Sequence, residues 1–123
     1  MNCDGALVLS SMLDGLTVNI VDLMQAIRDK IATGEYEFSQ HALNRSIRRV
    51  ISVQEIREAI DSGEIIEDYP NDKYGPSCLI LGFSASGQPI HVQCSHATRS
   101  LVKIITLYEP NPALWIDHRI RKS

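Results

Sequence analysis

The sequence lacks any hydrophobic run long enough to cross a membrane. Its longest apolar stretch, residues 101–107, is far shorter than the roughly 20 residues of a membrane helix, and Lys103 interrupts it. No basic segment precedes the apolar residues near the N-terminus, so a secretory signal is not predicted either. Hydrophobic residues make up 44% and charged residues 22%, which is the balance of a globular domain. We therefore expect a cytoplasmic protein that contacts no membrane.

Metal and cofactor motifs are also missing. The sequence contains no glycine-rich dinucleotide or phosphate loop, no nucleophile elbow and no HExxH. Its three cysteines lack the CxxC spacing of a metal knuckle. Cys94 and His96, with His91 nearby, carry donor atoms that zinc accepts, but neighbouring strand residues point to opposite faces and no second ligand pair is evident. We expect neither a metal nor a cofactor.

The first half of the chain has the periodicity of helices. Apolar residues recur near the 3.6-residue period over residues 17–33, and Gly34 follows as a stop. A short extended segment, residues 36–38, leads to Ser39, which is placed to cap a second helix over residues 40–50.

A third helix has the clearest start. Ser52 and Glu55 form a capping-box pattern, in which each side chain satisfies an exposed backbone donor of the other residue. The pattern predicts a helix over residues 53–62. Gly63 should end it in the left-handed conformation that glycine adopts without strain.

After residue 63 the hydrophobic period changes from 3.6 to 2, which is the spacing of strands. Turn residues separate the apolar runs and set the strand ends. The predicted strands cover residues 64–69, 77–83, 89–95 and 101–108.

The link between the second and third of these strands fixes their register. Residues 85–87 suit a three-residue hairpin that ends in a left-handed glycine. If Ser84 faces Gln88, then Cys78 faces Cys94. A disulfide between them can be drawn, but sheet geometry and a reducing cytosol favour two buried free thiols.

These elements predict an α+β domain. N-terminal helices should pack on one face of a four-stranded, mostly antiparallel sheet. We expect residues 1–35 to form an N-terminal extension with one helix, and residues 36–123 to form the main domain. Residues 115–121 should be a short C-terminal tail anchored by Trp115, with a helix as one reading.

The predicted second helix carries a basic face, although the net charge of the chain is −3. At 100° per residue, His41 shares an arc of about 100° with Arg45, Arg48 and Arg49, while Leu43, Ile47 and Val50 fall on the opposite side. Guanidiniums suit phosphate oxygens, and an imidazole titrates near neutral pH, so this face predicts an anion-binding surface. The alternative is a merely solvated face that pairs with the acidic residues between 55 and 68.

Other polar residues are weaker candidates. His91 lies mid-strand, in the face shared with Leu79 and Leu81, so a hydrogen-bonded core or edge histidine competes with a catalytic one. The loop after residue 95 adds Arg99 as a second basic point. Tyr108 ends the last predicted strand, where an open sheet exposes functional groups.

Several short motifs between residues 36 and 121 form a specific combination. They are His-Ala-x-x-Arg-x-x-x-Arg (His41, Ala42, Arg45, Arg49), Ile51-Ser52, Gly63-Glu64-Ile65-Ile66, Tyr69-Pro70, Pro76-Ser77-Cys78-Leu79, Pro89-Ile90-His91-Val92 and Tyr108-Glu109-Pro110. This combination resembles a small prokaryotic family described only as a domain of unknown function. Val50 departs from the glycine that the family tends to have after the second arginine, and residues 1–35 lie outside the resemblance.

That family is similar in layout to RelE-like and MqsR-like toxins, which belong with the barnase, EndoU, colicin and RelE ribonucleases. The resemblance implies a RelE-like fold and a metal-independent endoribonuclease toxin, in which a ribose 2′-hydroxyl attacks the adjacent phosphate. It implies RNA as the substrate, including ribosome-bound mRNA, and an antitoxin protein encoded beside it as the partner.

Together the basic face and the resemblance give each candidate a role. Arginines would neutralise the phosphate and the charge of the transition state, and His41 would move a proton together with His91 or Tyr108. The assignment of general acid and general base stays open. The predicted catalytic residues are His41, Arg45, Arg49, His91 and Tyr108, and the predicted RNA or phosphate contacts are Arg48, Arg99 and Lys103.

A non-catalytic reading competes with this one. A domain of the same fold would use the basic face to bind RNA or an acidic protein without cleaving anything. The two interpretations differ in one structural requirement. Catalysis needs His41 and a second proton carrier within reach of one phosphate, whereas binding does not.

Overall fold

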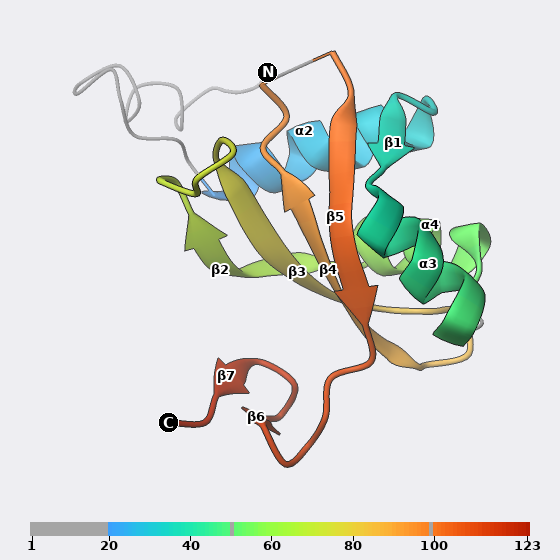
Figure 1. Ribbon diagram of the computed structural model, residues 1–123, viewed down its shortest axis with the longest axis vertical. Coiled ribbons are helices and arrows are strands. Elements are labelled where there is room, and N and C mark those ends of the chain that lie inside the picture. The colour runs from blue at the N-terminus through green and yellow to red at the C-terminus, as the bar shows by residue number, and fades with distance from the viewer. Residues whose placement is uncertain (1–19, 50, 99) are drawn as a thin grey trace.

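The computed structural model describes residues 20–49, 51–98 and 100–123, with the side chains of residues 45–49 outside the description. The described helices are α2 (Ile20–Ala32), α3 (Gln40–Arg49) and α4 (Val53–Asp61) (Figure 1). No helix within these ranges combines the length and the apolar character that a membrane span requires. The strands are β1 (Tyr36–Phe38), β2 (Glu64–Tyr69), β3 (Ser77–Phe83), β4 (Pro89–Ser95), β5 (Val102–Tyr108), β6 (Trp115–Ile116) and β7 (Ile120–Arg121).

The main sheet has five strands in the order β1-β5-β4-β3-β2. Strands β2 to β5 are antiparallel neighbours, as the alternating pattern predicts. The edge strand β1 pairs with β5 in parallel, with Tyr36 opposite Val102. The α+β class is therefore confirmed, but the sheet is mixed and five-stranded instead of the predicted four-stranded sheet of the RelE-like layout. The difference arises because residues 36–38 join the sheet as a fifth strand beside β5, from which they are far apart in the sequence.

The β3–β4 hairpin has the predicted register. The amide of Ser84 donates to the carbonyl of Gln88, and Gly87 adopts a φ of 89°. Cys78 lies opposite Cys94, and both are buried free thiols. A hydrogen bond with Cys78, together with burial, raises the pKa of Cys94, so this thiol stays protonated at neutral pH.

The helix caps also follow the sequence. The amide of Ala42 donates to the Ser39 hydroxyl at 2.9 Å, which caps α3. Ser52 and Glu55 make both hydrogen bonds of the capping box at the start of α4. Gly34 follows α2 with a φ of 79°, the left-handed conformation of a helix stop. The predicted start of α2 at residue 17 lies outside the described residues.

Gly63 is needed for space and not for a left-handed backbone, so that prediction is wrong. Its φ is not positive, but a β-carbon there would lie 2.6 Å from both the Ala59 carbonyl oxygen and an Ile80 methyl. Gly82 has the same role, because its β-carbon would lie 1.6 Å from the Ala59 oxygen. These two glycines let α4 pack directly against β3.

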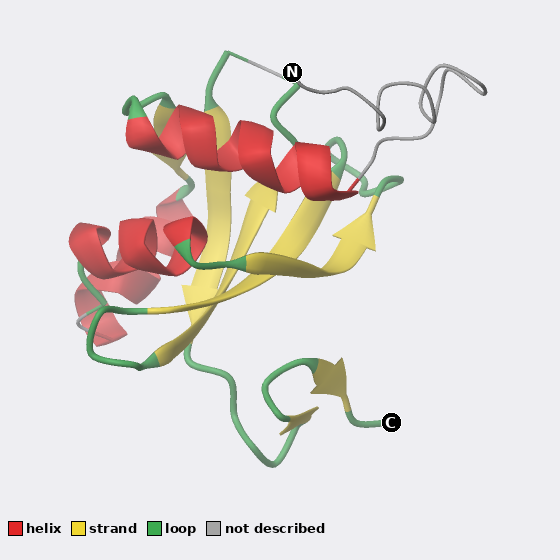
Figure 2. Ribbon diagram, turned by 180° about the vertical axis from the view of Figure 1, so that it is seen from behind, coloured by secondary structure: helices red, strands yellow, loops and turns green. Residues whose placement is uncertain are grey.

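The hydrophobic core lies between the helices and one face of the sheet. Figure 2 shows α2 and α4 across this face of the sheet. Ala42 of α3 is fully buried, whereas Leu43 is 45% exposed. The helix side opposite the basic face was expected to pack on the sheet; for Leu43 this expectation is wrong, because Ala42 is the buried residue of the first turn. The buried core side chains include Ile27, Ile56, Ile60, Ile80, Ile90, Val92, Val102, Ile104 and Leu107.

The C-terminal residues form a small hairpin where the sequence suggested a tail or a helix. Strand β6 pairs with β7, and Trp115 lies opposite Arg121. Asp117 and His118 in the turn have φ values of 52° and 63°. The Arg119 amide donates to the Ile116 carbonyl and closes a four-residue turn, in which non-glycine residues adopt positive φ at both central positions at a cost. Contacts with the sheet therefore hold the hairpin in place.

Candidate functional site on the open face of the sheet

The face of the main sheet opposite α2 and α4 is the open face (Figures 1 and 2). Along β4 the side chains alternate, so that Ile90, Val92 and Cys94 enter the core. His91, Gln93 and Ser95 consequently lie on the open face, beside the strands β3 and β5. This face has a covered end at His91 and an uncovered end at Ser95.

His91 is the centre of the covered end. Its side chain is fully buried, with the Trp115 ring 4.5 Å away edge-on. Nε2 lies 2.6 Å from the His118 carbonyl oxygen, and Nδ1 lies 3.2 Å from the Tyr108 hydroxyl. Strands β4 and β5 bring His91 and Tyr108 together directly, because the two residues are opposite in register.

The protonation of His91 follows from these contacts. Burial lowers its pKa from the ordinary value, so the ring is neutral at neutral pH. A carbonyl oxygen only accepts, so Nε2 carries the proton and donates to His118. Nδ1 must then accept, and the Tyr108 hydroxyl donates to it. His91 thereby fixes the direction of the Tyr108 hydroxyl proton.

Charged groups fasten the hairpin over this end. Arg121 donates to both carboxylate oxygens of Glu67 on β2, at 3.0 and 3.4 Å, and its guanidinium lies 4.5 Å from the Trp115 ring centre. Burial acts to raise the pKa of Glu67, but hydrogen bonds from Arg121 and Tyr69 lower it overall. Burial and the hydrogen bond to Glu67 raise the pKa of Tyr69 to about 12. Tyr69 is therefore a donor at neutral pH.

The uncovered end holds a cavity of about 560 Å³. Strands β4 and β5, the loop between β2 and β3, and the start of α3 surround it. Most of the lining residues carry polar side chains, and the loop adds one aromatic ring. The lining residues are Ser39, Asp72, Tyr74, Gly75, Pro76, Gln93, Ser95, Thr98, Lys103 and Ile105.

Hydrogen bonds orient the polar groups of this cavity. The buried Ser77 hydroxyl donates to the Asp72 carboxylate at 2.6 Å, so it must accept from the Gln93 amide nitrogen at 3.2 Å. This chain turns the carbonyl oxygen of Gln93 away from Ser77. The Ser95 hydroxyl accepts from the backbone amide of Lys103 at 2.9 Å, which leaves its own proton to donate.

Helix α3 lies beside β5 at the edge of the sheet (Figure 1). The Ser39 amide and hydroxyl donate to the carbonyls of Ile104 and Ile105, which fixes the start of the helix against this strand. His41 follows in the first turn and is exposed. Arg45 and Arg49 follow in the same helix, and their side chains lie outside the described residues.

The structure places the predicted site residues in three groups. His91 and Tyr108 meet at the covered end, Lys103 lines the cavity at the uncovered end, and His41 lies on α3. The side chains of Arg45, Arg48 and Arg49, and the whole of Arg99, lie outside the described residues.

The sequence interpretation missed two sets of contacts. The first set is the cavity contacts of Gln93 and Ser95. The strand alternation that assigns His91 to the open face also assigns these two residues to it, so the sequence carried a signal for them. The cover over His91 had no local signal, because Trp115 and His118 reach it from a segment far along the chain.

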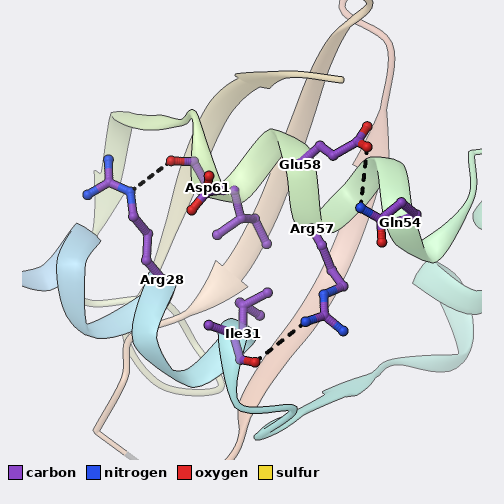
Figure 3. A pocket seen from close by; sticks show the side chains of 8 residues that line it. Arg28, Ile31, Gln54, Arg57, Glu58 and Asp61 are labelled. Carbon is purple, nitrogen blue, oxygen red and sulfur yellow. Dashed lines mark hydrogen bonds between the residues drawn. The ribbon is translucent and has the colours of Figure 1, made fainter. Parts of the chain in front are cut away.

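A second hollow lies on the helix side of the molecule (Figure 3). This groove of about 220 Å³ lies between α2 and α4. Arg28 donates to the carbonyls of Asp61 and Gly63, and Arg57 donates to the Ala32 carbonyl at 3.5 Å. The hydrogen bonds of these arginines link the two helices across the groove. Within the part of the chain that is described, no three His, Cys, Asp or Glu side chains gather as metal ligands do.

Comparison with known proteins identifies the family of the chain. Residues 38–109, more than half of the sequence, match the family "Domain of unknown function (DUF4258)". This match confirms the expected resemblance to a family described only as a domain of unknown function, and it includes no link to RelE-like or MqsR-like toxins. Neither the curated proteins nor the solved structures contain a match to the chain. The chain belongs to the DUF4258 family.

Proposed function

We propose that this protein is a metal-independent endoribonuclease that binds an RNA strand between α3 and the open face of the sheet. The ribose 2′-oxygen forms a bond to the adjacent phosphorus, and the bond from phosphorus to the 5′-oxygen breaks. A base takes the 2′-hydroxyl proton, and an acid gives a proton to the departing 5′-oxygen. The products are a 2′,3′-cyclic phosphate and a 5′-hydroxyl.

One observation carries this proposal. Helix α3, whose sequence carries His41, Arg45 and Arg49, starts against β5 through the hydrogen bonds of Ser39, and β5 ends at Tyr108. The predicted basic face and the Tyr108 hydroxyl therefore belong to two neighbouring elements. Arginine at these positions would neutralise a phosphate and the charge that develops on it in the transition state.

The contacts of His91 support a division of roles. His91 is buried with both ring nitrogens in hydrogen bonds, so it acts through Tyr108 as a positioning residue. Tyr108 is half-buried and would be the second proton carrier, with the exposed His41 as the first. The direction of each proton transfer is left to experiment.

A second function has an observation in its favour. Because the covered end of the open face buries His91 completely, the site has lost one of the two candidates for its second proton carrier. A domain that binds RNA, or an acidic protein, without cleaving it needs no such carrier. In either case, the proposal includes action in the cytoplasm and control by an antitoxin protein that binds the domain.

Expression in a bacterial host tests the proposed function without a choice of substrate. The wild-type chain should stop growth and break total RNA. A His41→Ala, Arg45→Ala double variant should do neither. Arg57→Ala, an arginine variant on the helix side of the sheet, is the matched control and should behave like wild type.

The same experiment separates the two candidate functions. Normal growth and intact RNA with soluble wild-type protein would contradict the ribonuclease proposal. If RNA still copurifies with the wild type but not with the double variant, the binding module is the correct function.

A further inference from the structure

We infer that the cavity at the uncovered end of the open face is a subsite for one unpaired nucleotide, with a preference for bases that carry an amino group. This inference rests on the proposed function, since the nucleotide would belong to the bound RNA strand. It concerns the residues around Gln93 and not the basic face predicted for α3.

The size and the aromatic rim of the cavity fit a base. Its volume of about 560 Å³ lies within the range of about 300 to 1,000 Å³ for small-molecule sites. Tyr74 is 81% exposed, and the Lys73 ammonium lies 5.3 Å from the centre of its ring. Unpaired bases stack on such rings, and Ile105 adds an apolar side chain to the lining.

The hydrogen-bonding groups predict the class of base. Asp72 and the Gln93 carbonyl oxygen are acceptors, and Ser77 holds both of them in fixed orientations. Acceptors pair with the amino groups of guanine, adenine and cytosine. Uracil has a carbonyl where cytosine has its amino group, and it carries no amino group. A donor is also present, because the Ser95 hydroxyl accepts from Lys103 and keeps its own proton for the ligand.

A single positive charge in the lining fits the phosphate. Lys103 lines the cavity from β5, on the side away from the loop that carries Asp72. A base toward Asp72 and a phosphate toward Lys103 would therefore match the charges of the two sides. Ser39 also lines the cavity, so a strand bound there would continue toward the first turn of α3.

Titration with nucleoside monophosphates tests the subsite directly. Calorimetry or amide chemical shifts would follow the binding of GMP, AMP, CMP and UMP, with ribose 5-phosphate and inorganic phosphate as probes without a base. The three amino-bearing nucleotides should bind at least about fivefold tighter than UMP, and ribose 5-phosphate should bind more weakly than all of them.

Variants assign the binding to the cavity. Tyr74→Ala should weaken every nucleotide by about tenfold, which corresponds to the loss of one stacked base. Lys103→Ala should weaken nucleotides but not the corresponding nucleosides, whereas Lys122→Ala is the matched lysine control and should have no effect. Gln93→Leu should reduce the preference over UMP.

The outcomes separate this inference from the proposed function. Equal binding of all four nucleotides and of ribose 5-phosphate, or binding that none of the cavity variants changes, would overturn the inference. Cleavage of RNA without any nucleotide binding at millimolar concentration would overturn it too, while the ribonuclease proposal stands. Selective binding in a protein that never cleaves RNA would support the subsite and contradict the ribonuclease proposal.

Discussion

The two ends of the open face use the same strands for different purposes. At the covered end, the C-terminal hairpin covers His91 with Trp115 and His118. Both ring nitrogens of His91 have hydrogen-bond partners in the fold. At the uncovered end, Gln93 and Ser95 lie two and four residues further along β4 and line a cavity. The polar groups of the first end stabilise the fold, whereas those of the second line a cavity that we propose binds a nucleotide.

Burial accounts for the different roles of the polar side chains at the two ends. A buried polar group must be satisfied internally, so His91 is committed to His118 and Tyr108. A polar group at the rim of a cavity is free of that requirement. Substitutions at the covered end should therefore change stability, and substitutions at the uncovered end should change binding.

Trp115→Ala should have the largest effect on stability. The side chain is 4% exposed and packs between His91 and Arg121, so truncation should lower the free energy of unfolding by about 3 to 5 kcal/mol. Urea denaturation at 25 °C measures this change. A loss below about 1 kcal/mol would mean that the hairpin contributes little to the fold.

Acidification should weaken the covered end through His91. Burial lowers the pKa of this histidine in the folded state, so the unfolded chain binds the proton more readily. The free energy of unfolding should therefore fall as pH drops below about 6.5, by at most about 1.4 kcal/mol per pH unit for one proton. Urea denaturation of the wild type and of His91→Gln, from pH 5 to 8, isolates this contribution. Parallel pH profiles for the two proteins would refute it.

Arg121→Ala should have an intermediate effect. It removes the two hydrogen bonds to Glu67 and the contact with the Trp115 ring, which together should lower the free energy of unfolding by about 1 kcal/mol. Arg119→Ala in the same hairpin removes a more exposed pair with Glu64 and should cost less. Equal losses of unfolding free energy in urea denaturation would mean that the contact of Arg121 with the Trp115 ring adds no stability.

Tyr74→Ala should have the smallest effect on stability. Because the ring is 81% exposed at the uncovered end, the free energy of unfolding should change by less than about 0.5 kcal/mol. Thermal and urea denaturation would show a profile close to wild type. A large loss would place Tyr74 among the structural residues and remove the contrast between the two ends.

The sequence predicts the local elements well. Strands β2, β3 and β4 have their predicted bounds, and the Ser84 to Gln88 turn sets the observed pairing of Cys78 with Cys94. These features depend on residues close in the sequence, where periodicity, capping and turn geometry act directly.

Features that depend on distant residues were not predictable. The parallel pairing of β1 with β5 joins residues about as far apart as Tyr36 and Val102. The cover over His91 depends on a hairpin whose turn residues, Asp117 and His118, carry no turn signature such as Asn-Gly. The cavity forms only when the loop around Tyr74 meets β4 and β5.

Cleavage of a matched pair of RNA strands tests the central proposal most directly. One strand is ordinary single-stranded RNA, and the other has the same sequence with 2′-O-methyl groups. Purified wild-type protein in a chelator should bind both strands but cut only the ordinary one, leaving 2′,3′-cyclic phosphate ends, and Tyr108→Phe should bind equally and cut far more slowly. Binding of both strands without cleavage of either would contradict the ribonuclease account.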